Sequence, residues 1–329
     1  MELPRYFMGK VMSSFLHLRR AFLCSIVIVF LINQPLFLYA QNLNTNTTDR
    51  LISIGDASFA SGDYNNAIEY FSQALIRDPY NANLYFKRAE ALANLGKYNQ
   101  AIYDYTQAIK IDPTFFRAYV QRGNAYYKIR DYVNAINDFT NAIRLNSNDY
   151  IPYYNRGLSY MMLGNYPSAI EDYTKALQLN PNYAYIYINR AISYANINNL
   201  DAAVRDLTTA SSITPNNPSI YYNRGIVFYK TGNINQALAD LSYAISLYPQ
   251  YADAYIARGT VYLTLNNYSR AIEDFTSAIN INPSKAEAYY NRGIAYKNIG
   301  RGDLALGDFD NACQYNRSYC TLNQILLNI

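Results

Sequence analysis

A small residue recurs every 34 positions along most of this chain, without a single insertion or deletion. It is Gly or Ala in eight copies, which we number repeats 1 to 8: Gly55, Ala89, Gly123, Gly157, Ala191, Gly225, Gly259 and Gly293. An Ala follows each small residue after 12 positions (Ala67 to Ala305), and another follows seven positions later (Ala74 to Ala312). A period of roughly 20–50 residues is typical of stacked structural units, so the spacing argues against an ordinary globular domain.

Each repeat has the pattern of two helices. In repeat 3, apolar residues recur at helical spacing over 117–129 and again over 132–145. Between the two segments, seven repeats carry a residue that tolerates the left-handed backbone at a helix end: Gly62, Gly96, Gly164, Asn198, Gly232, Asn266 and Gly300. Six repeats close with Pro: Pro79, Pro113, Pro181, Pro215, Pro249 and Pro283. One helix pair cannot bury its apolar surface alone, so neighbouring pairs must stack.

This spacing of small residue, Ala, Ala and Pro resembles the tetratricopeptide repeat family over residues 48–317. The resemblance implies an all-α fold, a right-handed superhelical solenoid of eight 34-residue helix-turn-helix repeats. Residues 318–329 are expected to form a capping helix, in which Leu322, Ile325 and Leu326 cover the last repeat. The resemblance also implies a concave groove, lined by the first helix of each repeat, that binds a peptide or a partner protein.

An Arg and an Asp occur together in seven of the eight repeats. The Arg stands directly before the small residue and the Asp 16 positions after the Arg, whereas repeat 1 has Ile54 and Tyr70 there. The seven pairs are Arg88 with Asp104, Arg122 with Asp138, Arg156 with Asp172, Arg190 with Asp206, Arg224 with Asp240, Arg258 with Asp274, and Arg292 with Asp308. This joint occurrence predicts a structural ion pair inside each repeat. Pairing with the adjacent repeat and an arginine array for an anionic ligand are the alternatives.

In the middle repeats, the positions that face the groove in this family carry apolar side chains. They precede the small residue by three positions or follow it by one or four, and Met162 lies beside them. We call the candidate ligand-groove residues the inner stripe: Tyr154, Leu158, Met161, Met162, Ile188, Ile192, Tyr222, Ile226 and Tyr229. An open apolar stripe would bind a peptide or protein partner. The alternative is that neighbouring inner helices cover these side chains from the side.

Residues 1–40 have the features of a secretory signal peptide. Lys10, Arg19 and Arg20 precede the apolar block 21–32, and the small residue Ala40 ends the segment, so cleavage is expected after it. Residues 41–47 would be a polar lead. A retained N-terminal anchor that associates with the membrane is the alternative. In an exported chain the remaining cysteines, Cys313 and Cys320, are a possible disulfide, and two buried free thiols are the alternative.

The chemistry that remains after cleavage is narrow. The one histidine, His17, lies in the segment expected to be removed, which excludes His-dependent nucleophiles and His-containing zinc sites. Residues 41–329 carry 24 basic and 23 acidic side chains, which is not the charge of a nucleic-acid binder. We therefore expect no enzyme activity, cofactor, metal or nucleic acid. The sequence predicts an exported scaffold (periplasmic, secreted or membrane-anchored). A carbohydrate-handling or polysaccharide-export-associated scaffold and a purely structural spacer are the alternatives.

Overall fold

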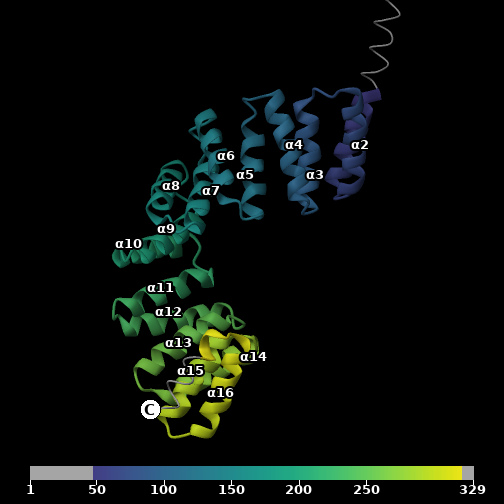
Figure 1. Ribbon diagram of the computed structural model, residues 1–329. Coiled ribbons are helices and arrows are strands. Elements are labelled where there is room, and N and C mark those ends of the chain that lie inside the picture. The colour runs from purple at the N-terminus through teal and green to yellow at the C-terminus, as the bar shows by residue number, and fades with distance from the viewer. Residues whose placement is uncertain (1–46, 321–329) are drawn as a thin grey trace, which may run out of the picture. The chain divides into compact units, whose positions relative to one another are not determined.

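The computed structural model describes residues 47–320, and this part of the chain contains helices and turns but no strand (Figure 1). The predicted all-α fold is therefore confirmed. The chain divides into two compact units, residues 1–129 (unit 1) and 130–329 (unit 2).

Both units are built from helices of nearly constant length. In unit 1, helical residues 47–60 are followed by α2 (Tyr64–Arg77), α3 (Ala82–Asn94), α4 (Tyr98–Ile111) and α5 (Phe116–Lys128). Unit 2 contains α6 (Tyr132–Leu145), α7 (Tyr150–Met162), α8 (Tyr166–Leu179), α9 (Ala184–Asn196), α10 (Leu200–Ile213), α11 (Pro218–Lys230), α12 (Ile234–Leu247), α13 (Ala252–Thr264), α14 (Tyr268–Ile281), α15 (Ala286–Asn298) and α16 (Gly302–Tyr315).

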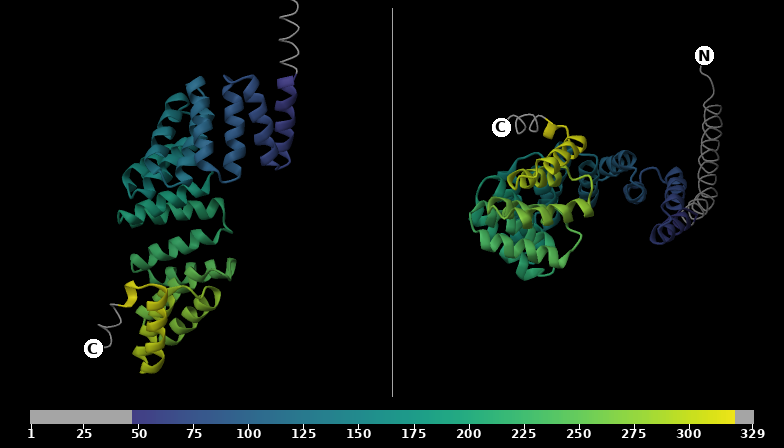
Figure 2. Two further views of the ribbon diagram at one scale, coloured as in Figure 1. Left: turned by 45° about the vertical axis from the view of Figure 1, so that its right-hand side comes forward. Right: turned by 90° about the horizontal axis from the view of Figure 1, so that it is seen from below.

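Within each unit, helices that follow one another in the chain pack side by side (Figures 1 and 2). In repeat 5, for example, α9 packs on α10, and α10 packs on α11 of repeat 6. The first helices of successive repeats also touch, as α7 does with α9 and α9 with α11. The predicted helix-turn-helix repeats are thus present, and each shares its core with its neighbours.

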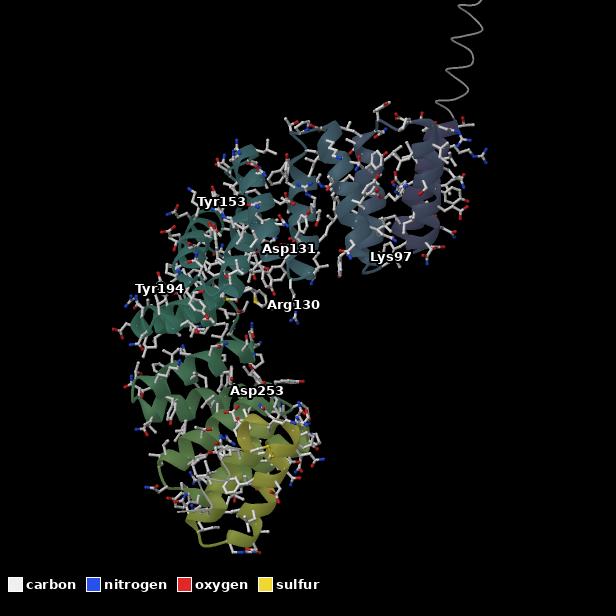
Figure 3. All side chains as sticks on the ribbon, viewed as in Figure 1. Lys97, Arg130, Asp131, Tyr153, Tyr194 and Asp253 are labelled. Atoms are coloured by element: carbon white, nitrogen blue, oxygen red, sulfur yellow. A yellow bond between two sulfur atoms is a disulfide. The ribbon has the colours of Figure 1, made fainter. Side chains whose placement is uncertain are left out.

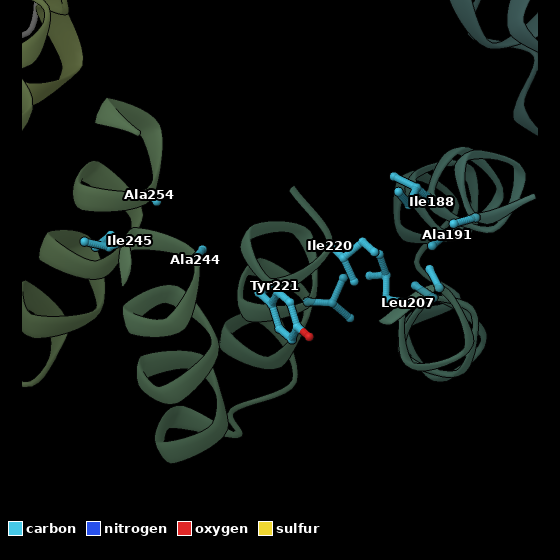
Figure 4. Packing of buried hydrophobic residues seen from close by; sticks show 12 residues of the cluster. Ile188, Ala191, Leu207, Ile220, Tyr221, Ala244, Ile245 and Ala254 are labelled. Carbon is cyan, nitrogen blue, oxygen red and sulfur yellow. The ribbon is translucent and has the colours of Figure 1, made fainter. Parts of the chain in front are cut away.

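The invariant small residue lets the two helices of a repeat approach closely. A Cβ atom at Gly157 would lie only 2.7 Å from Cε1 of Tyr173 on the partner helix. The two repeated alanines of this repeat, Ala169 and Ala176, have no exposed surface. Larger side chains then fill the space between repeats, as Ile188, Leu207 and Ile220 do in the cluster of Figure 4. The small residues spaced by 34 positions therefore mark the point of closest contact between the two helices of each repeat.

The turn between the two helices of each repeat uses a left-handed residue. The glycines and asparagines expected there have positive φ angles, for example 81° at Gly62 and 61° at Asn198. In repeat 3 the same position is Arg130, whose φ is 64° although the sequence offers neither Gly nor Asn. An Asp or Asn often begins the following helix, as Asp63 does by accepting a hydrogen bond from the backbone N–H of Asn66.

The Arg and Asp of one repeat form a bidentate ion pair. In repeat 4, Arg156 Nε donates to Asp172 Oδ2 at 2.8 Å, and Nη2 donates to Oδ1 at 2.7 Å. The side chain of Asp172 is 6% exposed and that of Arg156 is 19% exposed. The same contact joins Arg88 to Asp104, Arg190 to Asp206, Arg224 to Asp240, Arg258 to Asp274, and Arg292 to Asp308. The remaining two residues of the pattern belong to different units, Arg122 to unit 1 and Asp138 to unit 2. Asp138 is 3% exposed.

Each of these arginines also reaches the preceding repeat. Arg190 Nη1 donates to the hydroxyl of Thr174 on α8 at 3.0 Å, while its other two nitrogens hold Asp206. The hydroxyl acceptors stand at one position of the repeat: Ser72 for Arg88, Thr106 for Arg122, Thr140 for Arg156, Thr174 for Arg190, Thr208 for Arg224, Ser242 for Arg258, and Thr276 for Arg292. The carboxylate contact lies within a repeat and the hydroxyl contact between repeats, so the arginine ties neighbours together.

Tyrosine rings cover these arginines. The ring three positions before each Arg lies with its centroid 5.4–5.9 Å from the guanidinium carbon, as in Tyr187 with Arg190. The hydrogen bond to Asp104 raises the pKa of Arg88 above its ordinary value, although burial opposes it. Burial raises the pKa of the Asp172 carboxyl, and the hydrogen bond from Arg156 opposes that rise. The charges are therefore desolvated, and each depends on its partner.

At the end of the described chain, Cys313 and Cys320 form a disulfide with their Cα atoms 4.7 Å apart. Helix α16 stops at Tyr315, and the chain turns before it becomes helical again at Ser318. This turn brings the two cysteines together. Residues Leu322, Ile325 and Leu326 of the expected capping helix lie outside the described residues, as does the expected signal peptide. Among residues 47–320, no helix combines the length and apolar character needed to cross a bilayer.

We predict that Asp172→Ala lowers the free energy of unfolding by about 3–5 kcal/mol, because it leaves Arg156 partly buried without a counter-charge. Urea denaturation measures the difference. The control is Glu171→Ala, which removes the exposed carboxylate next to it and should change stability by less than about 0.5 kcal/mol. Equal stability of the two variants would show that the pair is not a buried structural contact.

Candidate functional site

The inner stripe comes from α7, α9 and α11, the first helices of repeats 4 to 6 in unit 2. On each helix it lies opposite the arginine and tyrosine layer, since the two sets of positions differ by about half a helical turn. Figure 3 shows the two sides of unit 2, with Tyr194 of α9 on one side and Asp253 of α13 on the other. A partner could therefore contact the inner stripe without breaking an ion pair.

In repeat 4 the stripe is a half-buried aromatic surface. Tyr154 packs against Tyr183, with ring centroids 5.6 Å apart, and against Tyr173 at 6.1 Å. Its hydroxyl accepts a hydrogen bond from Asn189 Nδ2 of repeat 5 at 3.1 Å. Leu158 and Met161 pack beside the same core cluster. These side chains are held in place by their neighbours, yet each keeps part of its surface accessible.

Two members of the stripe lie at opposite extremes of exposure. Ile188 is only 5% exposed and belongs to the core between repeats 5 and 6 (Figure 4). The expectation that it contributes open groove surface is wrong, because neighbouring helices cover it from the side. Met162 is 49% exposed. The alternative of sideways covering therefore applies to Ile188, but not to the whole stripe.

The stripe contains a pocket between α9 and α11. Its volume is about 140 Å³, and Ile192 of repeat 5 and Ile226 of repeat 6 line it. Leu207 of α10 lies behind them. The remaining lining residues are Ala191, Ala195, Asn196, Asn223, Val227 and Lys230. The pocket thus has an apolar interior with two amides and one cation beside it.

Two short side chains, Ala195 and Leu207, line the pocket. The position four residues after the small residue is Ala195 in repeat 5, whereas the flanking repeats carry Met161 and Tyr229. In repeat 4 the Met161 sulfur lies 3.9 Å from the hydroxyl of Tyr173 on α8, and the counterpart of Tyr173 in repeat 5 is the shorter Leu207, which lines the pocket. Ile192 and Ile226 were predicted from the sequence because they are apolar residues at groove positions. The pocket was missed, because short side chains such as Ala195 were not among the residues considered.

Charged groups flank the inner stripe within unit 2. Lys285, the residue before α15 of repeat 8, donates to Asp253 on α13 of repeat 7 at 2.5 Å. Burial raises the pKa of Tyr222, and the carboxylates of Asp253 and Glu287 add to the rise. Within residues 47–320, no three His, Cys, Asp or Glu side chains gather closely enough to hold a metal ion. The middle of the face is thus apolar, and charged groups of both signs lie beside it.

The first helices of unit 1 carry charged groups on the corresponding face. Lys87 donates to Asp56 at 2.6 Å, and Arg117 contacts Glu90 at 3.4 Å while lying 4.8 Å from the ring centre of Phe86. These contacts join successive repeats. Unit 1 therefore offers a polar inner face, unlike the apolar stripe of α7, α9 and α11.

Family models match most of the described chain. Models described as tetratricopeptide repeat match residues 58–103, 116–149, 150–183, 172–205 and 218–251. A further model, described as TPR repeat, matches 91–129, 193–232 and 261–300. No curated protein sequence matches the chain.

Several solved structures are similar to this chain. A tetratricopeptide repeat protein from Parabacteroides merdae shares 23% identity, covers 79% of this chain and 99% of its own, and has a TM-score of 0.59. The C-terminal part of a TPR repeat-containing protein from Cytophaga hutchinsonii shares 17% identity over 73% of this chain and 98% of its own, with a TM-score of 0.61.

A third similar structure is YrrB, described as a TPR protein with an unusual peptide-binding site. It is 25% identical, covers 58% of this chain and 99% of its own, and has a TM-score of 0.52. The repeat spacing, the paired helices and these matches agree. The chain belongs to the tetratricopeptide repeat family, whose helical scaffold is suited to binding peptides and proteins.

Proposed function

We propose that this chain is a non-enzymatic scaffold that binds a peptide segment of a partner protein on the inner face of α7, α9 and α11. The observation that carries the proposal is the pocket between α9 and α11, with a volume of about 140 Å³. A cavity of about 150 Å³ in another protein accepts a benzene ring. The pocket therefore has room for one apolar side chain of the peptide.

The residues around the pocket fit a peptide backbone. Asn196 donates one amide hydrogen to the carbonyl of Ile192 at 2.8 Å, and Asn223 donates to the carbonyl of Ser219 at 2.7 Å. An amide group has a second hydrogen and an oxygen, so each can also bond a backbone group of a ligand. Lys230 adds an exposed cation. An apolar pocket with a few polar groups at its edge is the usual form of a specific binding site.

The similarity to YrrB supports a peptide as the ligand, since that protein is described as having a peptide-binding site. The apolar character of the inner stripe further indicates that the bound segment carries apolar residues. Such binding should depend weakly on salt concentration, because screening acts on charges and not on apolar burial.

The test is Ala195→Met, which copies the residue of repeat 4 and fills the pocket without adding a charge. Peptides are first selected against the wild type from a random peptide library, and their affinities are then measured by fluorescence anisotropy. We expect Ala195→Met to weaken binding about 10- to 100-fold, since burial of one apolar side chain contributes about 1.5–3 kcal/mol. The control is Ala93→Met, the same substitution at the same position of repeat 2, which should leave affinity unchanged.

Two results would contradict this proposal. Equal affinity of Ala195→Met and the wild type would show that peptides bind elsewhere. Failure of the wild type to select any peptide would instead favour a structural spacer.

We further propose that the protein is exported. The basic and apolar pattern of residues 1–40 supports export, and so does the disulfide between Cys313 and Cys320, since disulfides persist in oxidising compartments. Peptide mass spectrometry of the protein from its native host tests this. We expect a mature N-terminus near Gln41 and no alkylation of either cysteine without reductant. An intact N-terminus together with two alkylated thiols would contradict export.

A further inference from the structure

Unit 1 contains a larger pocket, with a volume of about 260 Å³, between α2, α3 and α4. Ile68 and Leu92 give it an apolar wall, and Arg88 and Asp104 give it a charged one. Ser72, Gln100 and Tyr103 complete the lining. It is formed by the arginine layer of repeat 2, so it is separate from the peptide site proposed on unit 2.

The pocket exists because repeat 2 lacks a ring that the other arginine-containing repeats have. The position three residues after the small residue is Leu92 in repeat 2. In the other six repeats with the Arg it is aromatic: Tyr126, Tyr160, Tyr194, Phe228, Tyr262 and Tyr296. Leucine is shorter than tyrosine and has no planar face, so the space beside Arg88 stays open.

Three of the other repeats place a second ring beside the arginine. Arg190 lies between two rings, with its guanidinium carbon 5.8 Å from the centroid of Tyr187 and 5.8 Å from that of Tyr194. Arg224 and Arg292 likewise lie near two rings, the second being Phe228 at 5.9 Å and Tyr296 at 5.8 Å.

The guanidinium carbon of Arg88 lies 5.7 Å from the centroid of the first ring, Tyr85. The second ring is absent, and Arg88 lines the pocket together with Leu92, which takes that position. It also keeps the same partners as the other arginines, Asp104 and Ser72. The groups that hold an aromatic ring elsewhere in the chain are therefore present around an open space.

We propose that this pocket binds the aromatic side chain of a tyrosine or phenylalanine from a partner protein. The ring takes the place that the chain's own Tyr194 takes in repeat 5. It packs on Leu92 and Ile68 and faces the Arg88 guanidinium, a contact that favours aromatic over aliphatic side chains. Gln100, at the pocket, can bond a phenol hydroxyl.

The surroundings of the pocket favour a protein as the source of the ring. Tyr103 lines the pocket and is 62% exposed, and Ile76, one turn beyond Ser72 on α2, is 82% exposed. Tyr80, in the turn after α2, is 83% exposed. At the position of Ile76 the other repeats carry Lys110, Arg144, Gln178, Ser212, Ser246, Asn280 and Gln314. Exposed apolar residues in place of polar ones beside a pocket fit a partner surface better than a free small molecule.

The test uses two matched peptides, acetyl-Gly-Tyr-Gly-amide and acetyl-Gly-Leu-Gly-amide, added to the full chain labelled at isoleucine and leucine methyl groups. The methyl resonances of Ile68 and Leu92 report occupancy by NMR. We expect the tyrosine peptide to shift both resonances in a saturable way and to bind at least tenfold more tightly than the leucine peptide. No saturable shift, or equal shifts with the two peptides, would overturn the proposal.

The variant Leu92→Tyr supplies the ring from the chain itself. We expect it to remove the peptide-induced shift at Ile68 and to raise the melting temperature, since it restores the arrangement of the other repeats. Leu92→Ile is the control and should keep the shift. An unchanged peptide response in Leu92→Tyr would place the ligand elsewhere and overturn the proposal.

The reciprocal variant Tyr194→Leu opens the equivalent space in repeat 5, beside Arg190 and Asp206. It should create a new saturable response to the tyrosine peptide at the methyl group of Ile170, the counterpart of Ile68. A folded Tyr194→Leu protein that binds no peptide there would show that the missing ring does not define the site. Leu92→Tyr alters only unit 1, whereas the pocket of Ala195 lies in unit 2, so the outcome with Leu92→Tyr is independent of the function proposed above.

Discussion

The stacking of this chain depends on how one arginine per repeat distributes its N–H groups. Arg190 gives two nitrogens to Asp206 of its own repeat and the third to Thr174 of the repeat before it. The hydroxyl partner always belongs to the repeat before the arginine, and the first and last repeats differ from the others accordingly. Repeat 1 has no preceding repeat and carries Ile54 instead of Arg, and repeat 8 has Asp310 where the earlier repeats place a hydroxyl. The carboxylate fixes the helix pair and the hydroxyl fixes its neighbour, so a polar network specifies the stacking of an otherwise apolar core.

The two candidate sites occur where a repeat departs from its neighbours, one on the side of the first helices opposite the arginine layer and one within that layer. Ala195 and Leu207 stand where repeat 4 has Met161 and Tyr173, and both line the pocket between α9 and α11. Leu92 replaces a ring and leaves the pocket beside Arg88. In both cases the neighbouring repeats show what would fill the space. In a repeat protein, each repeat can be compared with the others in the same chain. A substitution in one repeat can open a site without loss of the fold.

The sequence alone predicted the helix pairs, the left-handed turns and the partner within the repeat of Arg156. These depend on local conformation or on spacing that recurs seven or eight times. It did not predict the hydroxyl of Thr140 as a second partner, although that residue recurs at the same spacing and could have been found. It also misplaced Ile188, because helical periodicity assigns a face to a residue but not the neighbour that covers that face. The left-handed Arg130 escaped prediction as well, since its side chain gives no sign of positive φ.

One arginine couples neighbouring repeats. A double-mutant cycle on Thr174→Val and Asp206→Ala, which remove the two partners of Arg190 on different repeats, measures this coupling. The free energy of unfolding is measured for the wild type, both single variants and the double variant. Coupling through Arg190 predicts an interaction energy of about 0.5–3 kcal/mol between the two substitutions. Effects that add to within about 0.5 kcal/mol would contradict the claim, because independent sites behave in that way.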